Sequence, residues 1–224
     1  MDFNKDKTVA VIFDTEWYVP PEDRGPSLTS LKANPAKADH RYLGGVFMRF
    51  FPLRQDIKME TQEIWVRNLT GAEEKSAIQK TYSFFKDSWK LLEGKDHMDP
   101  DLITIGTGIS RLDLPGLFVK SQAHNLDSIA NLYETFMKTK IVDLTDTAIP
   151  YLNLNTPRML YPVATNRIVS RFKIDAQRKE TGKSVWDMVD SGNLEGVKFR
   201  TSEEVKVLTK IYQKLVEQIF RDKQ

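Results

Sequence analysis

A short run of apolar and β-branched residues near the start of the chain, residues 8–13, sets the narrowest limits on the fold. Its sequence, Thr-Val-Ala-Val-Ile-Phe, lacks polar alternation, which is typical of a strand buried on both faces of a sheet. Similar runs occupy residues 102–105 and 141–144, and two more strand-like runs occupy residues 42–51 and 63–66. Strands followed by helical patterns predict an α/β fold with a mixed sheet flanked by helices.

The clearest helical pattern lies between Thr70 and Gly94. Its apolar residues recur at intervals of three and four and form one stripe, made up of Ile78, Tyr82, Phe85, Trp89 and Leu92. Thr70 and Glu73 match a capping box at the start, and Gly94 is a stop signal. Further helices are expected at residues 114–123, 127–138, 163–174, 184–190 and 201–220.

In two of these expected helices the apolar residues also form a continuous face. In residues 127–138 one face carries Ile129, Leu132, Tyr133 and Phe136. In the last helix the apolar stripe consists of Val205, Leu208, Tyr212, Leu215 and Ile219.

The composition excludes several kinds of site. The chain has no cysteine and only three histidines, which rules out disulfides, thiolate zinc sites and a cysteine nucleophile and disfavours a His-rich metal site. A net charge of +2 does not by itself indicate a polyanion partner. The sequence contains no Gly-x-Ser-x-Gly and no P-loop, and the pair Gly106 and Gly108 lacks the third glycine of a dinucleotide-binding motif.

No repeat or composition break divides the 224 residues, so we expect a single domain spanning residues 1–224. Residues 17–41 contain four prolines and are expected to form a loop insertion. The N-terminal segment lacks the apolar run of a signal peptide, and no apolar stretch approaches the roughly 18 residues of a membrane helix. These features predict a cytoplasmic protein without a membrane partner.

Two carboxylates follow the first predicted strand directly. Asp14 and Glu16 are two residues apart, so they point to the same face of a strand. Neighbouring carboxylates repel each other unless a cation lies between them, and hard divalent ions prefer such oxygen ligands. The spacing therefore suggests a metal site, although it also fits an aspartate that begins a turn with a solvated Glu16 beyond it.

Two other carboxylates each have a structural and a functional interpretation. Asp113 precedes a Leu-Pro pair and suits a helix N-cap, but it also lies where α/β folds place their sites. Glu204 completes a Thr-Ser-Glu-Glu capping box that begins at Thr201. If the helix instead begins earlier, Arg200 and Glu204 lie at positions i and i+4 and point together towards the other carboxylates, and we favour this arrangement.

Aromatic and basic residues offer two possible substrate contacts. Trp17 and Tyr18 follow the first strand, and they are predicted either to stack on bases or to pack beneath the loop as core. A basic stretch suits either the tracking of phosphates or a solvated helix face, and it contains Arg167, Arg171, Lys173, Arg178, Lys179 and Lys183.

Three motifs in chain order carry a resemblance to a known family. The first is a strand that ends in Asp-x-Glu, matched by residues 11–16, Val-Ile-Phe-Asp-Thr-Glu. The second reads Gly-His-Asn-Ile-x-x-Phe-Asp-Leu-Pro-x-Leu, matched by residues 106–117, Gly-Thr-Gly-Ile-Ser-Arg-Leu-Asp-Leu-Pro-Gly-Leu. The third, Tyr-x-x-x-Asp-Val on the last helix, corresponds to residues 200–205, Arg-Thr-Ser-Glu-Glu-Val. The chain thereby resembles the DEDD-type 3′–5′ exonucleases, and most closely the branch similar to the proofreading domains of family B DNA polymerases.

The resemblance implies a ribonuclease H-like fold and a divalent-metal-dependent 3′–5′ exonuclease that acts on single-stranded nucleic acid, with DNA favoured over RNA. It implies that two Mg²⁺ or Mn²⁺ ions about 4 Å apart activate a water and stabilise the leaving 3′ oxygen. The metal ligands implied are Asp14, Glu16, Asp113 and Glu204. The substrate contacts expected are Thr15, Trp17, Tyr18, Arg111, Arg167 and Arg171.

Five positions depart from the family pattern. Thr107 and Gly108 stand in place of His-Asn, Leu112 in place of Phe, Arg200 in place of Tyr and Glu204 in place of Asp. Arg200 cannot act as a general base because its guanidinium stays protonated, but its geometry suits a bidentate contact with the scissile phosphate. The alternative function is a catalytically degenerate nucleic-acid-binding or scaffold protein on the same fold.

Overall fold

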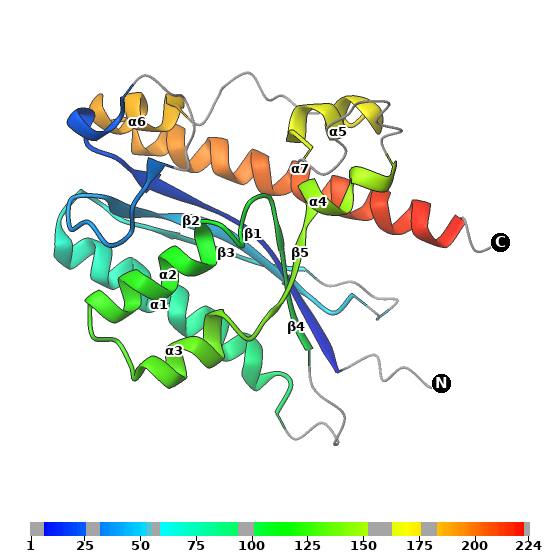
Figure 1. Ribbon diagram of the computed structural model, residues 1–224, viewed down its shortest axis with the longest axis horizontal. Helices are drawn as coiled ribbons and strands as arrows, with labels where there is room; N and C mark the ends of the chain where they lie inside the picture. Colours follow the sequence, from blue (N-terminus) through cyan, green and yellow to red (C-terminus); the bar gives the residue numbers. More distant parts are fainter. Residues whose placement is uncertain are drawn as a thin grey trace.

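Five strands form one mixed sheet in the order β3-β2-β1-β4-β5 (Figure 1). The computed structural model describes residues 7–25, 32–52, 54, 59–93, 101–151, 163–175 and 183–221. The strands are β1 (Thr8–Tyr18), β2 (Arg41–Phe50), β3 (Glu60–Trp65), β4 (Asp101–Gly106) and β5 (Lys140–Asp143). β2 is antiparallel to both of its neighbours, whereas β1, β4 and β5 are parallel. The predicted α/β fold with a mixed sheet is confirmed.

The central strand β1 extends further than its parallel neighbour. β1 pairs with β2 from Ala10 to Tyr18, but its register with β4 ends at the pair Ile12 and Ile105. Asp14 and Glu16 therefore lie beyond the paired part of β4, at the carboxyl end of the sheet. Ligand sites of open α/β sheets are found at this end.

Helices cover both faces of the sheet (Figure 1). They are α1 (Gly71–Lys90), α2 (Asp113–Ala123), α3 (Ile129–Phe136), α4 (Leu144–Thr147), α5 (Thr165–Arg171), α6 (Lys183–Asp190) and α7 (Leu194–Arg221), with short 3₁₀ turns η1 (Pro21–Asp23) and η3 (Ile149–Tyr151). α1, α2 and α3 lie on one face, and the long helix α7 crosses the other with α4 and α5 beside it. None of the helices in the described part of the chain is long and apolar enough to cross a membrane.

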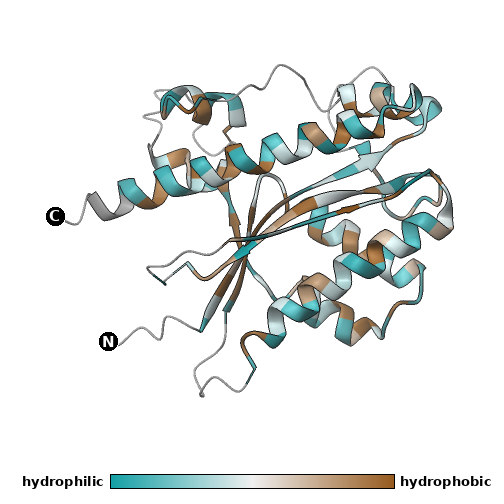
Figure 2. Cartoon of the chain, turned by 180° about the vertical axis from the view of Figure 1, so that it is seen from behind, coloured by the Kyte–Doolittle hydropathy of each residue, from teal (hydrophilic) through white to brown (hydrophobic). Residues whose placement is uncertain are grey.

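Two hydrophobic cores lie on opposite sides of the sheet, and the apolar faces of the helices turn inward (Figure 2). Val11 and Phe13 of β1 pack with α1, α2 and α3, whereas Ala10 and Ile12 pack with α4, α5 and α7. All four side chains are 0 % exposed. Burial on both faces explains why this strand has no polar alternation.

The largest difference from the predicted elements is the start of the last helix. α7 begins at Leu194 rather than at residue 201. The side chain of Asn193 accepts a hydrogen bond from the backbone N–H of Gly196 at 2.9 Å, which is an N-cap contact. The predicted stripe is confirmed as far as Leu215, because Val205, Leu208 and Leu215 are buried and Tyr212 packs against them. The side chain of Ile219 and the stop signal Gly94 lie outside the described residues.

The prediction for α3 was wrong for half of its apolar face. Leu132 and Phe136 are fully buried, but Ile129 and Tyr133 are 60 % and 55 % exposed. Leu132 and Phe136 are one turn apart and form a narrow inner stripe, whereas Ile129 and Tyr133 form the adjacent stripe on the solvent side. The neighbouring helices cover only the first of these stripes.

The described part of residues 17–41 contains more regular structure than the predicted loop insertion. β1 continues to Tyr18, and η1 follows at Pro21–Asp23. His40 is only 2 % exposed; its Nδ1 accepts from the backbone N–H of Asn34 at 2.8 Å, and its Nε2 lies 2.7 Å from Asp23. This histidine ties the two ends of the segment together.

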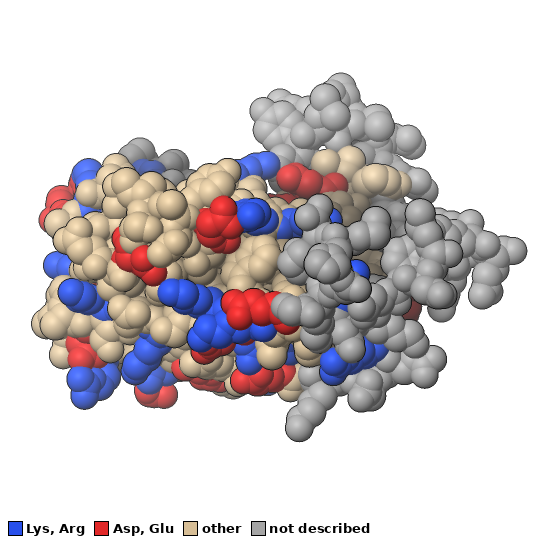
Figure 3. Space-filling view, turned by 90° about the horizontal axis from the view of Figure 1, so that it is seen from below, with Lys and Arg blue, Asp and Glu red and all other residues tan. Residues whose placement is uncertain are grey.

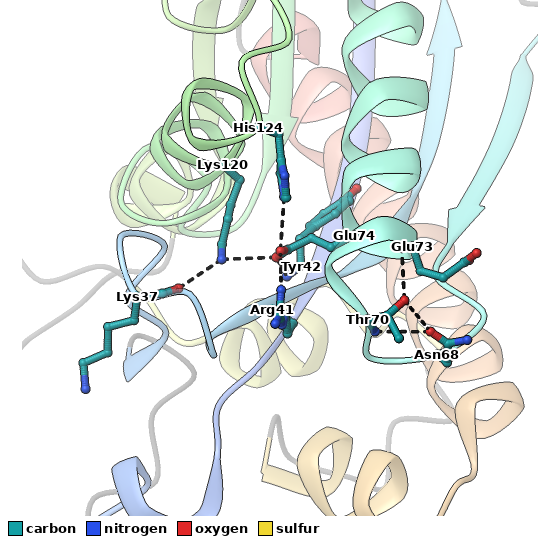
Figure 4. A network of polar contacts seen from close by, with 9 residues as sticks. All are labelled: Lys37, Arg41, Tyr42, Asn68, Thr70, Glu73, Glu74, Lys120 and His124. Atoms are coloured by element: carbon teal, nitrogen blue, oxygen red, sulfur yellow. Dashed lines mark hydrogen bonds and ion pairs between the residues drawn. The ribbon is translucent and has the colours of Figure 1, made fainter.

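The start of α1 is capped by Thr70, as predicted (Figure 4). The hydroxyl of Thr70 accepts from the backbone N–H of Glu73 at 3.4 Å. The reciprocal contact of a capping box is absent among the described residues, because the Glu73 carboxylate binds Arg67 and the Thr70 N–H binds Asn68. One half of the predicted box is therefore formed.

A buried carboxylate on α1 joins that helix to β2 and α2 (Figure 4). Glu74 is 2 % exposed and accepts from the backbone N–H of Tyr42 at 2.8 Å. It pairs with Arg41 at 3.1 Å and with Lys120 and His124 at 3.2 Å each. Lys120 is itself 3 % exposed, so the pair with Glu74 compensates a charge that water does not reach.

Candidate functional site

Three of the four predicted metal ligands meet at the carboxyl end of β1. One carboxylate oxygen from each of Asp14, Glu16 and Glu204 lies within 4.8 Å of the other two. Asp14 and Glu16 alternate with Thr15 along the strand and therefore face α7, which carries Glu204. Folding thus brings together carboxylates from the two ends of the chain.

Asp113 lies outside this group of three. It is the first residue of α2 and 5 % exposed, and it accepts a hydrogen bond from the hydroxyl of Thr15. The indole N–H of Trp17 donates to the same hydroxyl at 2.9 Å. The N-cap interpretation of Asp113 was wrong, because Leu112 holds that position and no side chain caps the helix.

Arg200 lies between two of the carboxylates. Its Nη1 is 2.5 Å from Oε1 of Glu16, and its Nη2 is 3.0 Å from Oε1 of Glu204. Its Nε is buried and has no hydrogen-bond partner in the described part of the chain. The predicted i, i+4 arrangement of Arg200 and Glu204 on one helix face is confirmed.

The alternative in which Thr201 caps the helix was wrong. Thr201 lies inside α7 and is fully buried. Its hydroxyl donates towards the carbonyl of Val197 at 3.0 Å and towards Oε1 of Glu16 at 2.9 Å. Thr201 was not predicted as a site residue. The signal was present, because Leu194, Val197 and Thr201 extend the apolar stripe of this helix backwards at intervals of three and four.

Burial and crowding raise the pKa values of three carboxylates. Burial is the largest cause for Asp14, followed by repulsion from Glu204, Glu16 and Asp113, so its pKa lies well above the usual range. Burial raises the pKa of Glu16 to about 7, even though Arg200 opposes the shift. Burial likewise raises the pKa of Asp113 to about 7, against the hydrogen bonds from Thr15 and Trp17. Perturbed carboxylates gathered at one place are typical of a functional site.

These shifts predict how the stability of the ion-free protein depends on pH. The unfolded chain loses the protons of Glu16 and Asp113 near their ordinary pKa values, whereas the folded protein keeps them up to about pH 7. The folded state therefore binds more protons, and the free energy of unfolding falls as the pH rises from about 4 to about 7. Urea titrations in EDTA measure this slope.

The control for this slope is the double variant Glu16→Gln, Asp113→Asn, in which neither group titrates. The difference between the stabilities of the two proteins reports the titration of these two carboxylates together with their coupling to Asp14, whose pKa both of them raise. We expect the wild type to lose stability relative to the variant as the pH rises. Parallel curves from about pH 4 to pH 8 would contradict the raised pKa values.

The structure places Trp17 in the core, the second of the two predicted arrangements. Trp17 is 4 % exposed, and its ring centroid lies 5.2 Å from that of Tyr42. Gly116 of α2 packs so closely that a Cβ there would lie 2.6 Å from the Trp17 ring. Tyr18 is held at the surface by a 2.9 Å hydrogen bond from its hydroxyl to Asp190. The predicted stacking of bases on Trp17 is therefore wrong.

Replacing Trp17 with alanine is expected to lower the free energy of unfolding by about 3–5 kcal/mol, as truncation of a core tryptophan does. The matched control is Phe199→Ala, because Phe199 is 67 % exposed. Its loss is expected to change stability by no more than about 0.5 kcal/mol. Equal urea midpoints for the two variants would show that Trp17 is not a core residue.

The three arginines predicted to contact substrate are exposed. Arg111 precedes α2 and lies 3.8 Å from Asp146, and Arg167 and Arg171 lie on α5. Lys173 is also exposed, whereas Arg178, Lys179 and the side chain of Lys183 lie outside the described residues. On the face that carries α1 and α3, positive and negative side chains are interspersed (Figure 3).

A second group of side chains with the chemistry of metal ligands consists of Asp23, Asp39 and His40. Both ring nitrogens of His40 already have protein partners, and Asp23 also pairs with Lys37 at 2.5 Å. These contacts join Asp23 to residues 34–40 and account for the buried position of His40.

Comparison of the chain with models of known protein families and with curated proteins finds no match.

Proposed function

We propose that the protein is a divalent-metal-dependent 3′–5′ exonuclease that acts on single-stranded nucleic acid, with DNA preferred to RNA. The observation that carries the proposal is the convergence of Asp14, Glu16 and Glu204 at the carboxyl end of the central strand. Asp113 lies near enough to raise the pKa values of both Asp14 and Glu16. Three converging carboxylates with a fourth nearby are typical of sites that bind divalent cations.

The proposal includes a ribonuclease H-like fold. Its support is the strand order β3-β2-β1-β4-β5. In this sheet β2 is the one strand that runs opposite to the other four. The long C-terminal helix α7 crosses one face of this sheet (Figure 1). It carries Glu204, which lies beside Asp14 and Glu16 of the first strand. The chain order of the three motifs is consistent with the same fold.

The donor set fits a divalent cation. Four carboxylates share the site with a single guanidinium, so three formal negative charges among these five side chains are not balanced. No hydrogen bond from the described residues reaches the carboxylate of Asp14, although the residue is partly buried. Mg²⁺ and Mn²⁺ prefer such oxygen ligands.

When bound, a divalent ion supplies positive charge that polarises a phosphodiester and lowers the pKa of water. The protein contributes the positions of the ligands. Thr201 and Arg200 fix the orientation of Glu16, and Arg200 also fixes Glu204. Because both terminal nitrogens of Arg200 bind carboxylates, a bidentate contact with the scissile phosphate would require this guanidinium to release them.

The proposed substrate is consistent with the distribution of positive charge. Arg111 lies near the site end of α2, and Arg167 and Arg171 are exposed on α5, on the same side of the sheet as α7. The opposite face has no extended patch of one sign among its described residues (Figure 3). We therefore assign the phosphate contacts of the substrate to the α5 side.

The experiment uses a single-stranded DNA labelled at its 5′ end, incubated with the protein and Mn²⁺, Mg²⁺ or EDTA. A ladder shortened from the 3′ end that disappears in EDTA is the expected result, and an RNA of the same sequence tests the preference for DNA. Glu204→Gln is expected to lose most of the activity. The control is the neighbouring Glu203, which pairs with Lys206, and Glu203→Gln is expected to retain the activity. A ladder that persists in EDTA, or no ladder with either ion, would overturn the proposal.

One observation favours a second candidate, a nucleic-acid-binding protein without catalytic activity. Arg200 already neutralises part of the charge of Glu16 and Glu204 without any metal. This protein would bind single strands equally well in EDTA and in Mn²⁺ and would shorten none of them. Fluorescence anisotropy with a labelled oligonucleotide, run beside the ladder assay, distinguishes the two functions.

A further inference from the structure

The position of Arg200 bears on how many ions the site accepts. Its two terminal nitrogens lie 2.5 Å from Glu16 and 3.0 Å from Glu204, and the three side chains are 11 %, 11 % and 15 % exposed, in the order Arg200, Glu16, Glu204. We infer that Arg200 is a permanent cation in the place of one of the two expected ions, so that the site binds a single divalent ion at Asp14. This inference rests on the proposed function and deepens it.

The guanidinium of Arg200 differs from a bound metal ion because it is covalently attached to the chain and cannot dissociate. Arginine stays protonated at any pH at which the protein folds, and its planar fork matches two carboxylates at once. In two-ion sites the ions are about 4 Å apart and share their carboxylates. An ion between Glu16 and Glu204 would have to displace Arg200, leaving a largely buried guanidinium without its partners.

The oxygen atoms support the same division of the site. Oε1 of Glu16 accepts from Arg200, and the hydroxyl of Thr201 lies 2.9 Å from the same oxygen, so an ion at this oxygen would compete with both groups. Asp14 receives no hydrogen bond from the described residues, although one of its oxygens lies within 4.8 Å of oxygens of Glu16 and Glu204. Of the three carboxylates that converge, Asp14 is the one that Arg200 does not bind, and it is therefore the one left for an ion.

The charge balance agrees with one ion. When all four carboxylates are ionised, they and Arg200 have a formal charge of three negative units, and one divalent ion reduces this to one. A second ion would make the cluster positive while placing three cationic groups within a few ångströms of one another. Mutual repulsion of these cations in a partly buried site opposes that state.

The test counts bound ions directly on the full chain. Equilibrium dialysis with Mn²⁺ gives the number of ions, and electron paramagnetic resonance distinguishes an isolated Mn²⁺ from a spin-coupled pair. We expect one uncoupled ion in the wild type and in Arg200→Lys, which keeps the positive charge, and two coupled ions in Arg200→Gln. The control Arg67→Gln removes an 85 % exposed arginine from a surface pair and is expected to bind one ion.

The outcomes separate this inference from the proposed function. Two coupled ions in the wild type would overturn the inference and leave the exonuclease proposal standing. No bound ion in the wild type would overturn both. One ion in the wild type and still one in a folded Arg200→Gln, judged by circular dichroism, would show that Arg200 does not exclude the second ion. If Arg200→Gln does not fold, the wild-type count and spectrum still decide between one ion and two.

Discussion

Replacing Asp14 with asparagine is expected to reduce 3′-end hydrolysis by at least about a hundredfold. In the proposed function this carboxylate is one of the ligands of the ion, and an ion of this kind supplies several kcal/mol of transition-state stabilisation. The same change is expected to raise the melting temperature of the ion-free protein, because it removes a carboxyl group whose ionisation is disfavoured in the folded state by burial and by three neighbouring carboxylates. For a chain of 224 residues, about 1 kcal/mol corresponds to roughly 2–4 °C.

The opposite signs of these two effects make the test specific. Asp87→Asn serves as the matched control, because Asp87 is 57 % exposed and pairs only at the surface with Lys90. It is expected to change neither activity nor melting temperature measurably. Full activity of Asp14→Asn would show that Asp14 is not part of the site. A large fall in the melting temperature of this variant would instead show that Asp14 has a structural role.

The second large effect is expected at the buried network around Glu74. Glu74→Gln keeps an oxygen for the backbone N–H of Tyr42 but leaves Arg41 and Lys120 without a compensating charge. Breaking a buried ion pair from one side costs about 3–5 kcal/mol, so the variant is expected to unfold at a markedly lower urea concentration with an unchanged m-value.

Two further variants identify the cause of this loss. Glu60→Gln removes a 62 % exposed carboxylate that pairs with Arg49, and it is expected to cost no more than about 1 kcal/mol. Adding Lys120→Met to Glu74→Gln removes the buried charge as well, so part of the lost stability returns. A Glu74→Gln variant no less stable than Glu60→Gln would mean that water reaches Lys120.

Much of the fold is contained in local patterns of the sequence. The unbroken apolar run at residues 8–13 predicted a strand buried on both faces, and the stripe from Ile78 to Leu92 predicted the helix that becomes α1. The spacing of Asp14 and Glu16 predicted that both face one side of the sheet, because alternation is a property of any strand. These predictions succeed because they depend only on residues within a turn or two of one another.

The site itself depends on contacts between distant parts of the chain. Glu16 and Arg200 are 184 positions apart, and no local pattern states that the guanidinium would lie against that carboxylate. Thr15 and Asp113 are 98 positions apart, and their hydrogen bond changes Asp113 from a predicted helix cap into a buried acceptor. In each case the outcome depends on which polar group is nearest after the sheet and α7 have packed.

Local sequence patterns were therefore enough to predict the α/β class, the buried central strand and the shared face of Asp14 and Glu16. The burial of Trp17, the start of α7 at Leu194 and the pairing of Arg200 with Glu16 and Glu204 became visible only in the folded protein. The physical reason is that backbone periodicity is encoded by neighbouring residues, whereas the charge state and partner of a buried side chain are set by whatever packing places beside it.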